Sequence, residues 1–183
     1  MSWQIDPAHS LVEFSVRHMM ISTVRGRFEK FSGTVDFDEN NPTNAVIDIE
    51  IDVTSINTNE PQRDGHLRSA DFFDAANYPV IRFKSTRVEK IDDSHGRIIG
   101  DLTIKNITKE VVLEAKYAGV AKSPWGGTSV GASATALINR EDWGLTWNQA
   151  LETGGVLVGK EIKIALELEL VKQEQPIVEA AMA

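Results

Sequence analysis

The sequence predicts an all-β protein, in which about eight antiparallel strands form a meander that closes into a barrel with one short helical insert. Three observations support this prediction. Apolar and polar residues alternate with a period of two over most of the chain, turn-forming stretches separate these runs at hairpin-like spacing, and one segment breaks the pattern. The 183 residues, 42% of them hydrophobic, are enough for one domain with a full-sized core.

The alternating runs are the predicted strands, because one buried and one wet face is typical of antiparallel sheets. They span residues 9–20, 27–38, 44–53, 80–88, 96–105, 110–119, 128–139 and 161–170. The apolar side of each run is expected to face inward. On three of the longest runs the inward residues are Val12, Phe14, Val16, His18 and Met20; Ala45, Ile47, Ile49, Ile51 and Val53; and Ile162, Ile164, Leu166, Leu168 and Leu170.

Residues 59–79 interrupt the alternation. Asn59 and Gln62 are spaced as in a capping box, and Pro61 suits the first turn of a helix. We therefore expect a short helix that continues to about Ser69 and lies between two strands of the barrel.

One predicted strand has small inward residues, because Ala132, Ala134 and Ala136 occupy three successive inward positions. Small residues there leave room for a ligand in a barrel of about eight strands, unless large residues opposite, such as Phe14 or Phe83, fill the space. An empty lumen of about 300 Å3 would cost about 7 kcal/mol at about 24 cal/mol per Å3, which rivals a typical folding stability of ~5–15 kcal/mol. The inner faces carry almost no charge, so a ligand that fills the lumen would be apolar.

The composition argues against several classes of function. The net charge of −8 and the pI near 5.0 oppose binding to nucleic acid and electrostatic docking on anionic membranes. The sequence contains no cysteine, which leaves no thiolate nucleophile, and the four histidines show no spacing typical of metal ligands. We therefore expect no metal and no cofactor.

No apolar run approaches the ~18 residues of a membrane-spanning helix, so no stable membrane insertion is expected. Residues 1–10 contain no basic segment followed by an apolar run, which is what a secretion signal would require. A cytoplasmic location is therefore expected, or a periplasmic one if the chain is a processed form.

Four separated stretches resemble the YceI-like family, in order and over nearly the whole chain from Trp3 to about Lys172. They are WQIDPAHSLVEFSVRH, RDGHLRSADFFDAANYPVIRF, GDLTIKNITKEVVL and NREDWGL. The resemblance implies a lipocalin-like barrel over residues 1–172, with the helical insert near its mouth. It also implies a long apolar ligand, such as a polyisoprenoid, an isoprenoid quinone or a fatty-acid-like chain, and no established catalytic residues. Residues 173–183 have no strand pattern and are expected to be a disordered tail.

The helical insert has a catalytic interpretation and a structural one. Asp64, His66 and Ser69 are the residue types of a nucleophile, base and orienting group, but Asp64 and His66 are two positions apart and cannot share a helix face. We favour the structural interpretation, in which Leu67 and Phe72 pack over the barrel end and touch the ligand.

Two further interpretations concern the strand ends. His18 has the inward phase and would offer a ligand head group one hydrogen bond, or else be a satisfied histidine at a strand end. Trp143 and Trp147 either line the mouth or plug the barrel end, and plugging is expected. Arg140 and Asp142 are expected to form an ion pair.

The function predicted from the sequence is to carry or sequester a long apolar lipid in the lumen, without chemistry. An enzyme acting on such a lipid, through His66 or His18, and a filled-barrel interaction module are the alternatives, and a homodimer is compatible with all three. The predicted ligand-binding residues are Phe14, Val16, His18, Met20, Ile49, Ile51, Leu67, Phe72, Phe83, Leu102, Ala132, Ala134, Ala136, Trp143, Ile164 and Leu166.

Overall fold

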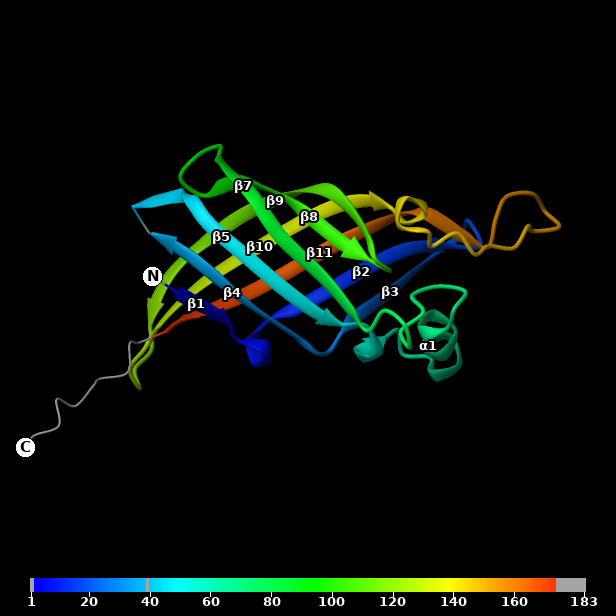
Figure 1. The fold of residues 1–183 in the computed structure, drawn as a ribbon, viewed down its shortest axis with the longest axis horizontal. Helices are drawn as coiled ribbons and strands as arrows, with labels where there is room; N and C mark the ends of the chain where they lie inside the picture. The colour runs from blue at the N-terminus through cyan, green and yellow to red at the C-terminus, as the bar shows by residue number, and fades with distance from the viewer. Residues whose placement is uncertain (1, 39, 174–183) are drawn as a thin grey trace, which may run out of the picture.

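The computed structural model describes residues 2–38 and 40–173, which contain eleven strands and four short helices (Figure 1). The strands are β1 (Ser2–Ile5), β2 (Leu11–His18), β3 (Ser22–Phe28), β4 (Phe31–Asp38), β5 (Asn41–Asp52), β6 (Ile56–Asn57), β7 (Val80–Lys90), β8 (His95–Ile104), β9 (Ile107–Lys122), β10 (Thr128–Asn139) and β11 (Val158–Lys172). The helices are α1 (Pro61–Arg68) and three 3-10 turns, η1 (Pro7–His9), η2 (Val53–Ser55) and η3 (Arg140–Trp143).

Eight of these strands close into a barrel in the order β1-β4-β5-β7-β8-β9-β10-β11. β1 completes the ring because it pairs with β4 on one side and with β11 on the other. Every pairing is antiparallel, and neighbours in the chain are mostly neighbours in the sheet. The predicted closed antiparallel barrel of about eight strands with one short helix is therefore confirmed.

β1 and β2 lie one after the other along the same edge of β11. Ile5 pairs with Leu170, and after the η1 turn Leu11 pairs with Glu167. On their other edges the two strands diverge, since β1 pairs with β4 and β2 pairs with β3. The sheet continues from β2 through β3 to the short β6, from which the chain enters α1 (Figure 1).

The residues buried inside the barrel largely follow the predicted alternation. They include Ile47 and Ile49 on β5, Ile81 and Phe83 on β7, Leu102 and Ile104 on β8, Val111 and Leu113 on β9, and Val130, Ala134 and Ala136 on β10. Apolar side chains on alternate positions of antiparallel strands thus share one core.

The prediction that Met20 continues the inner face of β2 is wrong. The strand ends at His18, and Met19 and Met20 form the turn into β3 with φ angles of 53° and 65°. Met20 is 59% exposed. A left-handed turn ends the period-two geometry, so the alternation of residue types in the sequence runs two residues past the strand itself.

The predicted helix is confirmed at Pro61–Arg68, but its N-cap is Glu60 rather than Asn59. The Glu60 carboxylate accepts hydrogen bonds from the backbone N–H groups of Gln62, at 3.2 Å, and Arg63, at 2.6 Å. Asn59 adopts a left-handed backbone conformation one residue earlier, with φ of 62°. A longer carboxylate side chain can satisfy two free N–H groups of the first turn at once, which explains the shift of the cap.

Of the tail predicted at 173–183, only Gln173 lies within the described residues. Its N–H donates a hydrogen bond of 2.9 Å to the carbonyl oxygen of Ser2. Within residues 2–38 and 40–173, no helix has the length and apolar character needed to cross a membrane.

Candidate functional site

Two cavities follow one another along the lumen of the barrel. The inner cavity, of about 170 Å3, has an apolar surface and lies at the end where α1 and the loop after β10 are found. Its wall includes Phe14 and Val16 from β2, Phe28 from β3, Leu67 from α1, and Phe72 and Phe73 from the loop after it.

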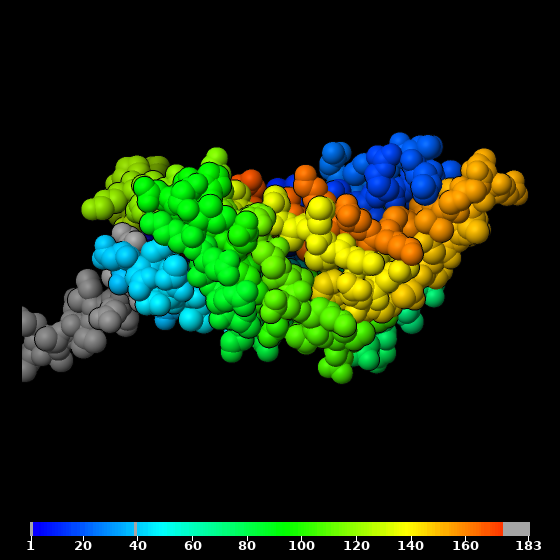
Figure 2. Space-filling model, turned by 90° about the horizontal axis from the view of Figure 1, so that it is seen from above, coloured from blue at the N-terminus to red at the C-terminus, as the bar shows by residue number. Residues whose placement is uncertain are grey.

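The outer cavity, of about 390 Å3, lies at the opposite end of the barrel, toward the β4–β5 and β7–β8 turns. Its deep wall is apolar and includes Ile47, Val130, Ala132 and Ala134, whereas its rim is polar. Figure 2 shows the two ends of the molecule, with the β7–β8 hairpin (green) and the start of β5 (cyan) at one end and the β10–β11 loop (orange) with the β2–β3 hairpin (blue) at the other.

The polar rim of the outer cavity carries both charges. Lys90 lies 3.3 Å from Asp93, and His95 lies 3.0 Å from Asp92. The backbone N–H of Ser94, followed by the His95 ring, lowers the pKa of Asp92 to about 2, so this carboxylate is charged at neutral pH. The rim can therefore offer a ligand both hydrogen-bond donors and acceptors.

The helical insert covers the end of the inner cavity. The family resemblance placed the insert near the barrel mouth, and in the structure it lies at the end of the barrel that holds the inner cavity. The polar rim lies at the opposite end, at the β4–β5 and β7–β8 turns. Within the insert, Phe73 packs on Phe28 of β3 with ring centroids 6.0 Å apart, and Phe72 packs on Trp147 at 5.4 Å. Aromatic packing thus fixes the insert against this end of the barrel.

Most of the predicted ligand-binding residues line one of the cavities. The inner cavity alone is lined by Phe14, Val16, Ile51, Leu67, Phe72, Leu102 and Ile164, the outer one alone by Ala132 and Ala134, and both by Ile49, Phe83 and Leu166. Sequence reasoning based on inward-facing positions therefore brought together residues that share the lumen.

Four of the predicted residues line neither cavity. His18 is half-buried at the end of β2 and pairs with Val158, and Met20 lies in the exposed turn beyond it. Ala136 is buried in the wall of β10. Trp143 is 2% exposed and its indole N–H donates a 2.9 Å hydrogen bond to the carbonyl oxygen of Leu102, which agrees with the plug interpretation.

The insert residues Asp64 and Arg63 anchor α1 to the end of β6. Asp64, which is 7% exposed, accepts hydrogen bonds from both the backbone N–H and the hydroxyl of Thr58. Arg63 donates to the Thr58 hydroxyl at 2.8 Å and to the Thr58 carbonyl oxygen at 2.7 Å. All the polar atoms of Thr58 are thus bonded to the helix, which is the condition for burying them.

Asp64, His66 and Ser69 do not converge. The His66 imidazole pairs with Asp71 at 2.9 Å near the surface, and its ring stands edge-on to Trp147. The Ser69 hydroxyl donates to the backbone carbonyl of His66 at 2.6 Å. A triad needs the hydroxyl hydrogen-bonded to the imidazole, and these three side chains are arranged otherwise.

Sequence reasoning missed the role of Arg140. Its predicted ion pair with Asp142 is replaced by a buried clamp, in which the guanidinium donates hydrogen bonds to the backbone carbonyl oxygens of Leu145, Trp147, Val158 and Gly159. Arg140 is 3% exposed, and burial lowers the pKa of its guanidinium. The acceptors are backbone groups, so no residue type in the sequence indicates them.

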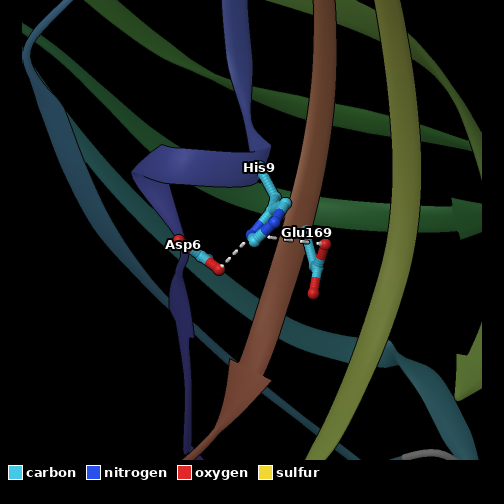
Figure 3. Close-up of side chains that lie close together, drawn as sticks. All are labelled: Asp6, His9 and Glu169. Atoms are coloured by element: carbon cyan, nitrogen blue, oxygen red, sulfur yellow. Dashed lines mark hydrogen bonds and ion pairs between the residues drawn. The ribbon is translucent and has the colours of Figure 1, made fainter. Parts of the chain in front are cut away.

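One group of described residues brings potential metal ligands together. Asp6, His9 and Glu169 meet at the surface, outside both cavities (Figure 3). The Nδ1 atom of His9 lies 2.7 Å from Oδ2 of Asp6 and 3.9 Å from Oε2 of Glu169. The hydrogen bond between His9 and Asp6 raises the pKa of His9 and lowers the pKa of Asp6. The pairing of β1 with β11 brings Glu169 close to Asp6 and His9, and the spacing of these residues along the sequence does not indicate that they meet.

The chain matches the YceI-like domain over residues 3–170. It belongs to the YceI-like family. A UPF0312 protein of Staphylococcus aureus strain MSSA476 is 40% identical over 169 residues, which is 92% of this chain and 96% of the relative. The YCEI protein of Campylobacter jejuni is 34% identical, with a TM-score of 0.73 over 86% of this chain and 90% of that chain.

Two more distant solved structures share the fold of this YceI-like protein. BcnA of Burkholderia cenocepacia is 24% identical, with a TM-score of 0.79 over 90% of this chain and 98% of that chain. A polyisoprenoid binding domain from Saccharophagus degradans is 14% identical, with a TM-score of 0.69 over 93% of this chain and 98% of that chain.

Proposed function

We propose that this YceI-like protein binds a long apolar lipid in its barrel and carries or sequesters it without chemical change. The observation that carries the proposal is the pair of cavities in series, whose deep walls are mainly apolar. Small-molecule sites are typically concave, mostly apolar and equipped with a few polar groups, and the outer rim supplies such groups.

The polarity of the two cavities gives the ligand a direction. A polar head group is best placed at the outer rim, where Lys90, Asp92 and His95 offer hydrogen bonds. The apolar tail is best placed toward the α1 end, because the inner cavity offers no polar partner on its surface.

Energetics favours an occupied lumen. At about 24 cal/mol per Å3, the inner cavity of about 170 Å3 would cost about 4 kcal/mol if it were empty. A tail with ~15 buried methylenes would contribute about 12 kcal/mol of gross transfer free energy, from which ordering and association costs are subtracted. The remainder is compatible with a ligand that stays bound through purification.

The ligand class we favour is a polyisoprenoid, an isoprenoid quinone or a fatty-acid-like chain. The Saccharophagus degradans domain of the same fold is described as polyisoprenoid-binding. An unbranched or isoprenoid tail is narrow enough to follow a lumen that extends along the barrel axis, whereas a compact ligand would use one cavity only.

The two alternative functions have less support. A catalytic role for His66 lacks a nucleophile at its imidazole, because Ser69 bonds to a backbone carbonyl instead. An interaction module with a filled barrel would require a solid core, and the lumen contains cavities of about 170 and 390 Å3.

Solvent extraction of the purified protein, followed by mass spectrometry, tests the proposal. We expect one lipid with a long apolar chain, and native mass spectrometry is expected to show one such molecule per chain, unchanged after incubation. If the protein yields no lipid and refuses added isoprenoids and fatty acids, the carrier function is wrong. A chemically altered lipid after incubation would favour the enzyme instead.

A further inference from the structure

The inner and outer cavities meet at a waist formed by five side chains that line both. These are Ile49, Phe83, Leu113, Leu166 and Leu168. We propose that Phe83 is the constriction that determines which tail lengths the barrel accepts. This inference rests on the proposed function, since it names the residue that selects among lipids of one class.

Phe83 stands opposite the β11 side of the waist. In the ring of eight strands β7 is the fourth and β11 the eighth, so Phe83 lies across the lumen from Leu166 and Leu168. Ile49, its register partner on β5, and Leu113 on β9 complete the waist on the Phe83 side. Phe83 is the only ring among these five side chains and thus the largest obstacle between the cavities.

The position of the Phe83 ring depends on a glycine in the next strand. A Cβ atom at Gly100 of β8 would lie 2.5 Å from Cζ of Phe83, so the ring rests against the backbone of β8 where a side chain would otherwise stand. The ring is buried, with 6% of the residue exposed, yet empty space borders it on both sides along the lumen. It therefore has room to move when a tail presses on it, unlike a side chain in a close-packed core.

The consequence is a length threshold. A tail short enough to end in the outer cavity leaves Phe83 in place over Gly100. A longer tail reaches the apolar inner cavity only if it displaces the ring, and it then gains the burial that this cavity offers. Affinity is therefore expected to depend on tail length in two stages, with the break at the waist.

Competition among isoprenoid alcohols tests the inference. Delipidated protein is mixed with equal amounts of alcohols of two, four and nine isoprene units, and native mass spectrometry gives the occupancy of each. Phe83→Leu is expected to raise the ratio of nine-unit to two-unit occupancy by about tenfold over that of the wild type. Phe83→Ala is expected to raise it further, and circular dichroism confirms that each variant is folded.

Two substitutions to phenylalanine serve as a matched pair. Val111→Phe fills the inner cavity and is expected to lower the nine-unit to two-unit ratio, whereas Ala134→Phe fills the outer cavity and is expected to lower occupancy by all three alcohols. Should Phe83→Ala fail to fold, the comparison of Phe83→Leu with Val111→Phe decides the matter.

The outcomes separate this inference from the function on which it rests. If the wild type binds the alcohols but the ratio in Phe83→Leu equals that of the wild type, Phe83 does not select tail length, whatever the ratio in Val111→Phe, although lipid binding stands. If the folded wild type binds none of the alcohols and no fatty acid, both the function and the inference are overturned.

Discussion

Several polar side chains of this barrel form hydrogen bonds with backbone groups. For two of them, Asp64 and Ser69, residue type alone suggested a catalytic role. Asp64 accepts hydrogen bonds from Thr58, and Ser69 donates one to the carbonyl of His66. Arg140 donates to two carbonyl oxygens of the loop between β10 and β11 and to two at the start of β11. Asp64 and Arg140 in this way pair buried backbone groups that need hydrogen-bond partners. At the scale of the residue, the hydrogen bonds of these side chains therefore indicate a structural role.

Arg140→Met is expected to destabilise the protein by about 3 kcal/mol or more, because each buried carbonyl left without a donor costs roughly 1–3 kcal/mol. Urea denaturation monitored by circular dichroism measures the change. Arg87→Met is the control, since Arg87 is exposed and pairs with Glu89, and exposed pairs contribute about 0–1 kcal/mol. Similar losses in the two variants would contradict the clamp.

The pair of Asp6 and His9 makes a prediction about titration. Its hydrogen bond raises the pKa of His9 above 6.5 and lowers that of Asp6 below 3.8. The pair is therefore fully ionised between these ordinary values. Its contribution is lost as the pH falls through the lowered pKa of Asp6, and also as the pH rises through the raised pKa of His9.

Asp6→Asn is expected to lower the pKa of His9 toward 6.5, as measured by NMR titration of the imidazole protons. Glu169→Gln is the matched control and is expected to lower it less, because Glu169 lies 3.9 Å away and acts only through its charge. An equal drop in both variants would show that the hydrogen bond to Asp6 is not the main cause.

At the scale of the element, the strands could be predicted because alternation reports burial directly. Ile47 and Ile49, or Val111 and Leu113, are inward in the structure as they are in the pattern. The residues at which strands and helices begin and end could not be predicted in the same way, because they depend on local backbone geometry. Met20 keeps the apolar phase of β2 but lies in a left-handed turn, and Glu60 replaced Asn59 as the cap of α1.

The residues that line the candidate site could be predicted from the sequence more readily than the contacts among them. Ala132 and Ala134 indicated room in the lumen, and they line the outer cavity. The waist at Phe83 could not be predicted, since it depends on which residues of β7 and β11 stand level across the barrel. Register across a closed sheet is a property of all the pairings together, and one sequence does not specify it.

The insert between β6 and β7 is expected to be held by Asp64. In Asp64→Ala the buried N–H and hydroxyl of Thr58 lose their acceptor, so local opening of residues 58–78 becomes easier. Hydrogen exchange of their backbone amides is expected to accelerate about tenfold or more, while exchange in β8 to β10 stays close to that of the wild type.

Asp71→Ala is the control for this element, because it removes only the partner of His66 near the surface. It is expected to change exchange in the insert much less than Asp64→Ala does. If the two variants behave alike, or if Asp64→Ala accelerates exchange throughout the barrel, the insert does not open as a separate unit.

At the scale of the whole molecule, the proposed lipid binding in the lumen is expected to affect the stability of the barrel. A solid barrel of this size would gain core packing where this one has cavities of about 170 and 390 Å3. The outer rim, the waist and the inner cavity lie in sequence between the two ends of the barrel, so one extended ligand would contact strands on all sides of the ring. Its binding is therefore expected to stabilise the barrel as a unit.

Delipidated protein is expected to melt below the loaded protein. A ligand at 100 times its Kd adds about 2.7 kcal/mol, and about 1 kcal/mol shifts the Tm of a chain of this length by roughly 2–4 °C, which predicts a difference of about 5–10 °C. Scanning calorimetry of the protein before and after extraction, and after addition of an isoprenoid alcohol, measures it. Ala134→Phe, which occupies the outer cavity, is expected to show a smaller rise on addition of the alcohol. An equal Tm with and without bound lipid would mean that the folded barrel does not depend on its contents, and the lumen would then not be the binding site.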